Sequence, residues 1–382
     1  MQVFQRKRIE MLLKDLIKDL CLLPDQLKSI RIDTISCDSR QMQANGLFVA
    51  LDGFKVKGES FIKQAIAQGA IVIAKKGASR HIDDYVIPPE ICLLDVADPK
   101  KFLKDITLRF FDNPSLKVRT IGVTGTNGKT TITYLLESIL KEDKKSSAIV
   151  GTINYRIAGQ ATPSKNTTPG FLDNQSLLYQ LAQKKVPYCV MEVSSHALDQ
   201  GRVDEINFVG AIFTNLTQDH LDYHKDMEAY FQAKALLFKN LGINAWAMIN
   251  GDDSYAGRLL LLSKGKNYTY GIQSDADIKA CDIEYSLSGT RFRIVFPKGE
   301  IIVQTSFIGA HNVYNILAAA GAAFCEGIDL NVIKKGIESL VHVPGRLQRI
   351  EANQNFFIFI DYAHTEDGLI NVLSSLRKVS SN

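Results

Sequence analysis

The sequence predicts an α/β protein in which mostly parallel sheets are covered by helices. Two observations lead to this fold class. Short apolar runs alternate with segments of helical periodicity along most of the chain, which is the pattern of strands joined by crossover helices. A glycine-rich stretch at 124–131 also joins one apolar run to a helix-like segment, as expected where a strand passes into a helix. In such a sheet, ligands bind at the carboxyl ends of the strands.

The composition is that of a globular protein and argues against several other classes. The 382 residues suggest two or three domains, and a hydrophobic content of 46% allows buried cores. The 45 basic and 41 acidic residues are spread along the chain, so we expect no nucleic-acid partner. No apolar stretch approaches the roughly 18 residues of a membrane span, and the six cysteines occur singly. We therefore expect a protein of the reducing cytoplasm, without membrane contact. We also expect a monomer.

Residues 1–105 are expected to form a small N-terminal α/β domain. Apolar residues recur at helical spacing over 9–20 and predict an amphipathic helix. Packing in the core is the default for such a helix, and binding to a membrane surface is the alternative. Short apolar runs then predict strands, with one helix-like segment among them. The strands are expected at 30–35, 47–51, 71–74 and 91–96, and the helix at 61–68.

Residues 106–342 are expected to form a central domain around a mostly parallel sheet. Three closely spaced segments near its end predict an antiparallel meander appended to that sheet, and Asp329 is a suitable N-cap for the second of two final helices. This domain follows the helix-like segment 102–111. The predicted strands are 120–123, 148–150, 188–191, 208–213 and 245–249, the meander is 281–285, 291–296 and 301–307, and the helices include 132–140, 227–238, 310–324 and 329–340.

Residues 343–382 are expected to begin a third, Rossmann-like domain. The stretch Val343-Pro344-Gly345-Arg346 is the best hinge candidate, because proline and glycine interrupt helices and strands. An apolar strand at 356–360 and one helix-like segment follow. This length falls short of the roughly 50 residues of the smallest ordinary domains, so we expect the chain to stop inside its last domain.

The stretch Thr124-Gly125-Thr126-Asn127-Gly128-Lys129-Thr130-Thr131 predicts a phosphate-binding loop (P-loop). The two glycines would let backbone N–H groups close around a triphosphate, Lys129 would place a charge near the β- and γ-oxygens, and Thr130 could offer its hydroxyl to Mg²⁺. The standard spacing would require a glycine at 123, where the chain has Val123. An ordinary strand-to-helix turn is the alternative. The central domain is therefore expected to resemble a P-loop ATPase.

Carboxylates end two of the predicted strands. Glu192 follows the run at 188–191, and Asp361 follows the run at 356–360. A carboxylate at the carboxyl end of a strand is well placed to bind Mg²⁺ or a ligand. The alternative for each is a solvated strand end.

Three further features carry weaker signals. Ser195 and His196 are adjacent but lack the surroundings of a nucleophile elbow, which argues against a hydrolase. His220 and His224 have the i, i+4 spacing of a transition-metal site, although carboxylates near a nucleotide loop favour Mg²⁺ over zinc. Composition alone places Lys234 on the solvated face of its helix.

Taken together, these stretches resemble the Mur ligase family. The resemblance runs from about Asp38 to His364 and rests on motifs in a fixed order. They are Asp38-Ser39-Arg40, Gly46-Leu47-Phe48-Val49-Ala50, the loop at 124–131, Asn166-Thr167-Thr168-Pro169, 191–198, Gln200-Gly201-Arg202-Val203, Thr214-Asn215-Leu216, Asp219-His220-Leu221-Asp222-Tyr223-His224, Gly309-Ala310-His311-Asn312 and Asp361-Tyr362-Ala363-His364.

The resemblance implies an ATP-dependent amide ligase of peptidoglycan synthesis. ATP would phosphorylate the terminal carboxylate of UDP-N-acetylmuramoyl-L-alanyl-D-glutamate, and the amine of a third amino acid would attack the acyl phosphate. Of the two amino acids, meso-diaminopimelate is favoured over L-lysine. ATP and Mg²⁺ are the implied cofactors, and Mg²⁺ and Lys129 would screen the repulsion between ATP and the carboxylate.

The resemblance also implies roles for particular residues. Lys234 would be carbamylated, which turns a cation into a carboxylate-like metal ligand. The implied catalytic residues are Lys129, Glu192, His220 and Lys234, and the implied metal ligands are Thr130, Glu192, His220 and Lys234. Nucleotide contacts are implied for Gly125, Thr126, Asn127, Gly128, Lys129, Thr130, Thr131, Asn312, Arg346 and Asp361. Contacts to the UDP-substrate are implied for Ser39, Arg40, Asn166, Thr167, Thr168, Ser194, Gln200 and Arg202.

The chain departs from the family pattern in two places. Lys57-Gly58-Glu59 stands where the family usually has Asp-Gly-His, which leaves the uridine contacts there open. The motif that selects the incoming amino acid in the family has no counterpart between Asp361 and Asn382. Two alternatives therefore stay open. One is a ligase similar to folylpolyglutamate synthetase, and the other is a truncated protein that binds nucleotide and UDP-sugar without catalysis.

Overall fold

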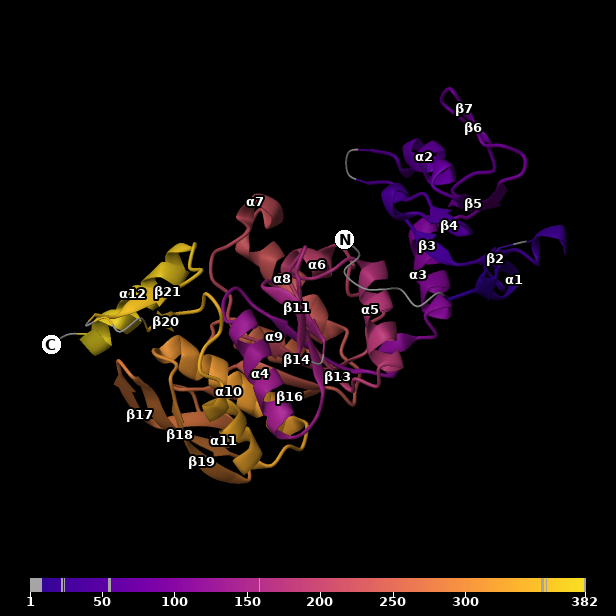
Figure 1. Ribbon diagram of the computed structural model, residues 1–382. Coiled ribbons are helices and arrows are strands. Elements are labelled where there is room, and N and C mark those ends of the chain that lie inside the picture. Colours follow the sequence, from indigo (N-terminus) through magenta and orange to yellow (C-terminus); the bar gives the residue numbers. More distant parts are fainter. Residues whose placement is uncertain are drawn as a thin grey trace. The chain divides into compact units, whose positions relative to one another are not determined.

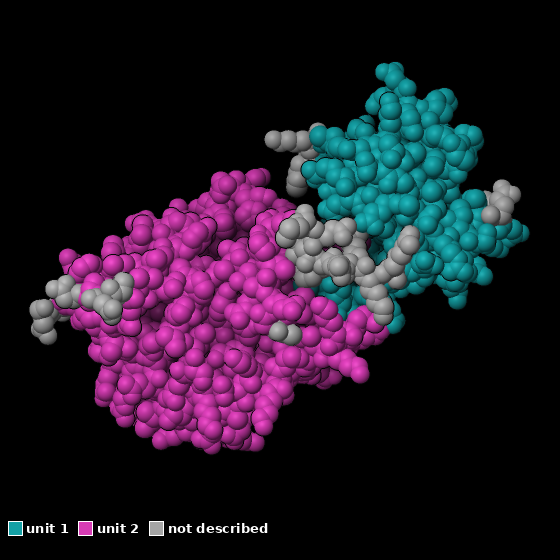
Figure 2. Space-filling view, viewed as in Figure 1, with its two compact units in different colours: residues 1–114, 175–180 teal, residues 115–174, 181–382 magenta. Residues whose placement is uncertain are grey.

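The computed structural model describes residues 9–21, 23, 25–53, 56–157, 159–351, 354 and 356–380 (Figure 1). The predicted first and third domains include residues 1–8 and 381–382, which lie outside the described residues. The chain forms two compact units (Figure 2): unit 1 is Met1–Pro114 with Gln175–Gln180, and unit 2 is Ser115–Asn174 with Leu181–Asn382. Both units combine helices with parallel strands, so the predicted α/β class is confirmed.

Unit 1 is built on a parallel sheet with the strand order β3-β4-β5-β8. Its core includes Phe48 and Ile73 from the strands and Ile62 from α2, all completely buried. The strands are β1 (Met11–Leu12), β2 (Arg31–Ile32), β3 (Thr34–Ser36), β4 (Gly46–Val49), β5 (Ala70–Lys75), β6 (His81–Ile82), β7 (Tyr85–Val86) and β8 (Cys92–Asp95). The helices are α1 (Leu13–Leu16), α2 (Ile62–Ala67) and α3 (Pro99–Phe110).

Two predictions for unit 1 are wrong in detail. The helix expected at 9–20 is only the single turn α1, because Met11 and Leu12 instead pair with β2 as an antiparallel strand. The strand expected at 30–35 is interrupted at Asp33, since β2 pairs with β1 while β3 pairs with β4 in a different sheet. The apolar positions were nevertheless informative, because Leu13, Leu16 and Ile17 are buried.

Unit 2 is built on an 11-stranded sheet with the order β12-β11-β10-β13-β9-β14-β15-β16-β17-β18-β19, counted over the described residues. The strands from β10 to β17 in this order pair in parallel, and the outer pairs are antiparallel. The bounds are β9 (Arg119–Thr124), β10 (Ser147–Val150), β11 (Asn154–Ile157), β12 (Gln160–Pro163), β13 (Tyr188–Glu192), β14 (Phe208–Phe213), β15 (Trp246–Asn250), β16 (Lys266–Gly271), β17 (Ile278–Ser286), β18 (Gly289–Phe296) and β19 (Gly299–Thr305). The predicted meander is β17, β18 and β19.

Helices cover both faces of this sheet (Figure 1). Ile121 and Val123 of β9 share one buried cluster with residues of α4 and α10, whereas the intervening Gly122 lies against Leu237 of α8. The helices are α4 (Lys129–Glu142), α5 (Phe171–Gln183), α6 (Ser195–Asp199), α7 (Leu221–His224), α8 (Met227–Lys239), α9 (Ala256–Leu262), α10 (Ala310–Cys325), α11 (Leu330–Ser339) and α12 (Glu366–Ser380). The α5 residues are divided between the two units.

The segment after α11 is grouped with unit 2 and contains β20 (Gln348–Ile350), β21 (Ile358–Ile360) and α12. The two strands pair with each other in an antiparallel ribbon. Several large apolar side chains of this segment are exposed, among them Phe356 at 61% and Leu373 at 64%. Over the described residues, no helix is long and apolar enough to cross a bilayer.

The order of the strands creates a switch point at the carboxyl end of β9. From β9 the chain passes through α4 to β10 on one side, and β14 pairs with β9 on the other side. Crevices form where consecutive connections leave a parallel sheet in opposite directions. The loop that follows β9 therefore lies where this fold places a ligand.

Candidate active site

The loop between β9 and α4 has the backbone shape of a phosphate-binding loop. Gly125 and Gly128 have φ angles of +143° and +92°, a region that side chains with a Cβ rarely adopt. A Cβ on Gly125 would lie 1.8 Å from Thr214 Oγ1, and one on Gly128 would lie 2.3 Å from Asn315 Oδ1. Both glycines are thus required by conformation and by space. The loop closes tightly although Val123, fully buried in β9, replaces the first glycine of the standard spacing.

Neighbouring strands and helices hold the middle of the loop. The backbone N–H of Asn127 donates to Asn215 Oδ1 at 2.9 Å, and its carbonyl accepts from Thr214 Oγ1 at 2.6 Å. The side-chain amide of Asn127 donates to Asp367 Oδ2 on α12 at 2.9 Å. The amino end of α4, a 14-residue helix, faces the loop and favours bound anions.

Two lysines converge on this loop, the half-buried Lys129 and the buried Lys234. Lys129 Nζ donates to the carbonyls of Gly125 and Thr126 at 2.9 and 2.8 Å, and Lys234 Nζ on α8 donates to the Gly125 carbonyl at 2.8 Å. Burial lowers the pKa of Lys129, and the nearby carboxylate of Glu192 opposes that shift. Burial, and next the charge of Lys129, hold the pKa of Lys234 well below its usual value.

The prediction that Lys234 lies on a solvated surface is wrong. Its exposed fraction is 2%, and its Nζ lies 4.4 Å from the ring centroid of Tyr230, one turn earlier on α8. The Tyr230 hydroxyl is 3.2 Å from Thr126 Oγ1. Composition could not reveal this position, because α8 turns a face that includes a lysine toward the phosphate loop.

Glu192 lies beside the same loop, on the neighbouring strand β13. Its residue pairs with Val123 of β9, and it is 1% exposed. Thr152, just after β10, fixes both oxygens of the carboxylate: its N–H donates to Oε1 at 3.0 Å and its hydroxyl donates to Oε2 at 2.9 Å. The solvated-strand-end alternative for Glu192 does not describe this buried and fully oriented carboxylate.

Three histidines lie at the carboxyl edge of the sheet near α6 and α7. The His196 ring packs 4.9 Å from that of His220 and 5.4 Å from that of His224, measured between centroids. His224 Nε2 is 2.9 Å from Ser195 Oγ, so the serine pairs with a distant histidine and not with its neighbour. Burial is the main cause that lowers the pKa of each histidine. Among the residues that the structure describes, no cluster of three or more His, Cys, Asp or Glu is suited to hold a metal.

Five of the residues expected to bind the UDP-substrate form one hydrogen-bonded network next to Glu192. Arg202 donates to Gln200 Oε1 at 2.6 and 2.9 Å and to the Thr168 carbonyl at 3.2 Å. Thr168, which is 1% exposed, donates to the Glu192 carbonyl at 2.8 Å and accepts from the Ser194 N–H at 3.1 Å. Thr168 thus supports the site from within. Thr167 is half-buried and lies 3.0 Å from Thr152, and Asn166 nearby is exposed.

Ser39 and Arg40 belong to unit 1. Ser39 is 3% exposed, and its hydroxyl donates to Gln64 Oε1 at 2.7 Å. Arg40 is exposed and forms a bidentate pair with Asp38. In the stretch 57–59, which departs from the family pattern, Glu59 accepts a hydrogen bond from Nζ of the buried Lys75 at 3.0 Å.

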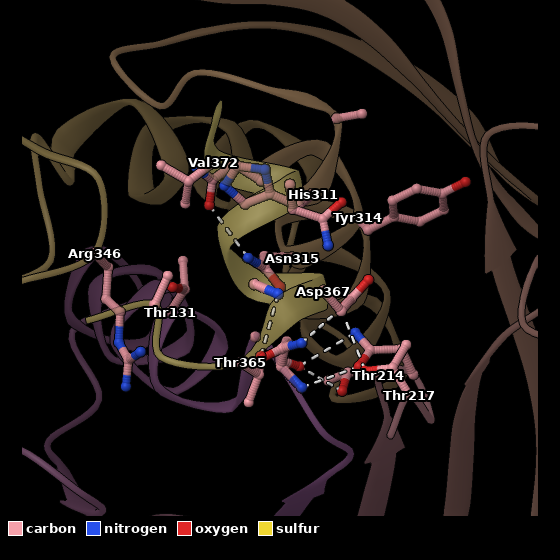
Figure 3. A pocket seen from close by; sticks show the side chains of 18 of the residues that line it. Thr131, Thr214, Thr217, His311, Tyr314, Asn315, Arg346, Thr365, Asp367 and Val372 are labelled. Atoms are coloured by element: carbon pink, nitrogen blue, oxygen red, sulfur yellow. Dashed lines mark hydrogen bonds between the residues drawn. The ribbon is translucent and has the colours of Figure 1, made fainter. Parts of the chain in front are cut away.

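A cavity of about 330 Å³ opens next to the phosphate loop (Figure 3). Arg346 and Thr131 lie on one side of it, and Asp367 lies on another. Arg346 Nη2 donates to Thr130 Oγ1 at 3.1 Å. The predicted nucleotide residues among its lining are Asn127, Gly128, Thr131, Asn312, Arg346 and Asp361.

Asp361 and Asn312 are both engaged with backbone groups around this cavity. Asp361 accepts from the N–H groups of Leu347 and Ala363, which fixes the turn after β21. Asn312 donates to the Ile308 carbonyl at 2.9 Å. The cavity has the size of a small-molecule site, and several polar side chains line it.

Fold and site together define a nucleotide-binding α/β protein of the P-loop class. Two family descriptions match the chain: "Mur ligase middle domain" over residues 123–323 and "Mur ligase family, catalytic domain" over residues 31–110. The chain belongs to the Mur ligase family, and it is therefore an ATP-dependent ligase.

Its relatives carry a consistent name. The chain is 39% identical over 358 residues to the UDP-N-acetylmuramoyl-L-alanyl-D-glutamate–2,6-diaminopimelate ligase of Oceanobacillus iheyensis, covering 92% of this chain and 71% of the relative. The protein of the same name from Clostridium botulinum is 38% identical, with 91% and 71% covered. A solved structure titled with this ligase has a TM-score of 0.81 at 29% identity, covering 98% of this chain and 75% of that one. Folylpolyglutamate synthase from Mycobacterium tuberculosis shares the fold at a TM-score of 0.60 and 17% identity, with 71% and 69% covered.

Proposed function

We propose that this protein joins 2,6-diaminopimelate to UDP-N-acetylmuramoyl-L-alanyl-D-glutamate at the expense of ATP, as a step of peptidoglycan synthesis. The observation that carries the proposal is the convergence of Lys129, Lys234 and Glu192 on one phosphate loop. The names of the relatives at 38–39% identity support the choice of substrates. Diaminopimelate stays favoured over lysine on this ground.

The nucleotide would bind with its phosphates in the loop and its nucleoside in the adjoining cavity. The N–H groups at the start of α4 and the ammonium of Lys129 would hold the β- and γ-phosphates. To do so, Lys129 exchanges its two loop carbonyls, at 2.9 and 2.8 Å, for phosphate oxygens. Arg346, Asn312 and Asp361 line the cavity and would contact the nucleoside or the phosphates.

The donor set fits Mg²⁺ in part as it stands. The Glu192 carboxylate and the Thr130 hydroxyl are oxygen ligands of the kind that Mg²⁺ prefers. An ammonium at Lys234 does not fit, but the low pKa of this buried amine makes its neutral form available to add CO₂, which gives a carbamate and releases one proton. His220 is expected to complete the set. Bound Mg²⁺ would neutralise the charge of the phosphates.

The reaction proceeds in two steps. A carboxylate oxygen of the substrate attacks the γ-phosphorus while the bond to the β-phosphate oxygen breaks, which yields an acyl phosphate and ADP. The neutral amine of the amino acid then attacks the acyl carbon, phosphate leaves, and the amine proton passes to solvent. Lys129 lies where it can balance the negative charge of the first step, since its Nζ contacts Gly125 and Thr126.

The residues expected to hold the UDP-substrate divide into two groups. The network of Thr167, Thr168, Ser194, Gln200 and Arg202 adjoins Glu192, so it is proposed to hold the dipeptide end near the γ-phosphate. Within it, the buried Thr168 would act by supporting its neighbours. Asn166, Ser39 and Arg40 are proposed to contact the rest of the molecule, the latter two at the UDP end.

The test is amide formation by the purified chain with ATP, Mg²⁺, UDP-N-acetylmuramoyl-L-alanyl-D-glutamate and diaminopimelate or lysine, followed by mass spectrometry. We expect the diaminopimelate product and a stoichiometric release of phosphate. Tight binding of both substrates without any product would support the alternative of a binding protein without catalysis. Glutamate addition to a folate, with no binding of the UDP-substrate, would favour the other alternative.

The organisation of the chain and its location are proposed from the same family pattern. We propose domain boundaries at 105/106 and 342/343, an active monomer, and a place in the cytoplasm where UDP-linked precursors are made. Limited proteolysis with mass spectrometry tests the boundaries, and light scattering tests the oligomeric state. Cleavage inside 106–342 before cleavage near 343–346 would argue against the second boundary.

A further inference from the structure

A chain of three side-chain oxygens links Glu192 to the loop that contains Thr167. The Thr152 hydroxyl lies 2.9 Å from Glu192 Oε2 and 3.0 Å from Thr167 Oγ1. The Thr152 N–H also donates to Glu192 Oε1 at 3.0 Å. A Cβ on Gly151 would lie 2.1 Å from Glu192 Oε1, so the carboxylate rests directly on the backbone at 151–152.

The direction of these hydrogen bonds follows from the number of protons. An ionised carboxylate can only accept, and a threonine hydroxyl has one proton to donate. The Thr152 hydroxyl therefore donates its hydrogen bond to Glu192, and its oxygen can only accept a hydrogen bond from Thr167. The proton between Thr152 and Thr167 consequently comes from Thr167. Because the only hydroxyl proton of Thr167 is engaged with Thr152, the Thr167 oxygen can only accept a hydrogen bond from a ligand.

Thr168 provides a contrast within the same loop. Its hydroxyl donates to the Glu192 carbonyl at 2.8 Å and accepts from the Ser194 N–H at 3.1 Å, and the residue is 1% exposed. Thr168 has no accessible hydrogen-bonding capacity left for a ligand. Thr167, which is only half-buried, keeps an acceptor.

We propose that Thr152 is a positioning residue that fixes the Glu192 carboxylate and turns Thr167 into an acceptor for an N–H group of the bound substrate. The inference rests on the proposed function, in which the UDP-substrate offers peptide N–H donors. A carboxylate or phosphate is excluded as the partner of Thr167, because two acceptors cannot form a hydrogen bond. The device also ties the substrate loop to the carboxylate proposed to bind the metal.

The first test removes the Thr152 hydroxyl. Thr152→Val keeps the shape and the N–H bond to Glu192 but loses the hydroxyl, while Thr152→Ser retains it. Partners that orient a metal ligand are typically worth about 10- to 100-fold, so we expect Thr152→Val to lower kcat by at least about tenfold and Thr152→Ser to restore most of it. The Mn²⁺ affinity of the ADP-bound protein, measured by electron paramagnetic resonance, should weaken in parallel.

A matched control separates this effect from a loss of stability. Thr162→Val on β12 removes a hydroxyl that donates to the Tyr155 carbonyl at 3.2 Å and should leave both kcat and Mn²⁺ affinity unchanged. Equal kcat and Mn²⁺ affinity in Thr152→Val and the wild type, at unchanged melting temperatures, would overturn the role of Thr152.

The second test addresses the polarity of Thr167 with substrate analogues. In two analogues, one peptide N–H of the UDP-substrate is replaced by an ester oxygen, either before or after the alanyl residue. Loss of one hydrogen bond corresponds to an affinity change on the order of fivefold. We expect calorimetry to show this loss for one analogue with the wild type, and to show no such loss with Thr167→Val.

The outcomes are distinguishable from a failure of the proposed function. If the wild type does not bind the unmodified UDP-substrate, the proposed function and the Thr167 assignment fall together, while the Mn²⁺ measurement still decides the role of Thr152. A second outcome is that the wild type binds the unmodified substrate while the loss of affinity on going to each analogue is the same for the wild type and for Thr167→Val. In that case only the assignment of Thr167 as an acceptor is overturned.

Discussion

Replacing Lys234 with methionine should abolish activity while leaving the fold intact. The side chain is 2% exposed and has one hydrogen bond, from Nζ to the Gly125 carbonyl at 2.8 Å. That carbonyl keeps Lys129 as a second donor at 2.9 Å, so no buried acceptor is left unpaired. One hydrogen bond contributes about 1 kcal/mol, and the added apolar burial of methionine offsets part of it. We therefore expect the free energy of unfolding to change by less than about 1 kcal/mol.

The effect on catalysis should be far larger, because the variant cannot form the carbamate. Removing one group that stabilises charge in a transition state typically costs about 10²- to 10³-fold in kcat, and we expect a loss of at least this size. The assay is phosphate release at saturating ATP and UDP-substrate, with urea unfolding measured on the same samples. A variant that keeps more than a tenth of the wild-type kcat would refute the role given to Lys234, and a variant that unfolds would refute the packing argument.

Three further predictions concern other parts of unit 2. Gly128→Ala should weaken ADP binding by about tenfold or more in calorimetry, since a Cβ would lie 2.3 Å from Asn315 Oδ1; unchanged affinity would contradict the loop geometry. Arg346→Gln should raise the KM for ATP about tenfold with little change in unfolding, and a normal KM would argue against a nucleotide contact. The third prediction concerns Glu326. Burial raises the pKa of its carboxyl group, but hydrogen bonds, above all the one from Arg119, outweigh burial and hold the pKa below its ordinary value. The ionised Glu326 therefore stabilises the folded state above about pH 4.5, and this stabilisation is lost as the pH falls further. Because Arg119 is half-exposed and solvent weakens the ion pair, we expect Glu326→Gln to lower the free energy of unfolding by about 1–2 kcal/mol at pH 7. A cost that does not shrink at low pH would contradict this assignment.

The strands of unit 2 were predictable because both faces of its sheet are covered. Buried strands such as β13 and β14 are continuous apolar runs, and turns or helices bound them on both sides. The pattern fails where a segment pairs with a distant one. Leu12 has helical spacing with Leu16 and Leu20, yet Met11 and Leu12 form a strand because β2 lies beside them.

The candidate site was predictable where a residue follows a strand in the parallel sheet. The phosphate loop and Glu192 were found in this way, and the same reasoning applied to the strand at 148–150 would have indicated Thr152. Lys234 was indicated only by the resemblance to Mur ligases, and Tyr230 and Asp367 were not indicated at all. The positions of these three residues depend on which helix face is packed against the loop. Such packing follows from tertiary structure and leaves no local signal in the sequence.

The most direct test of the proposed mechanism is the fate of the substrate's carboxylate oxygen. The chain is incubated with ATP, Mg²⁺, diaminopimelate and UDP-N-acetylmuramoyl-L-alanyl-D-glutamate labelled with ¹⁸O in its terminal carboxylate, and the released phosphate is analysed by mass spectrometry. An acyl phosphate formed beside Lys129 and Glu192 requires one ¹⁸O atom in each phosphate released. Phosphate without the label, at a normal rate of ATP consumption, would contradict the mechanism.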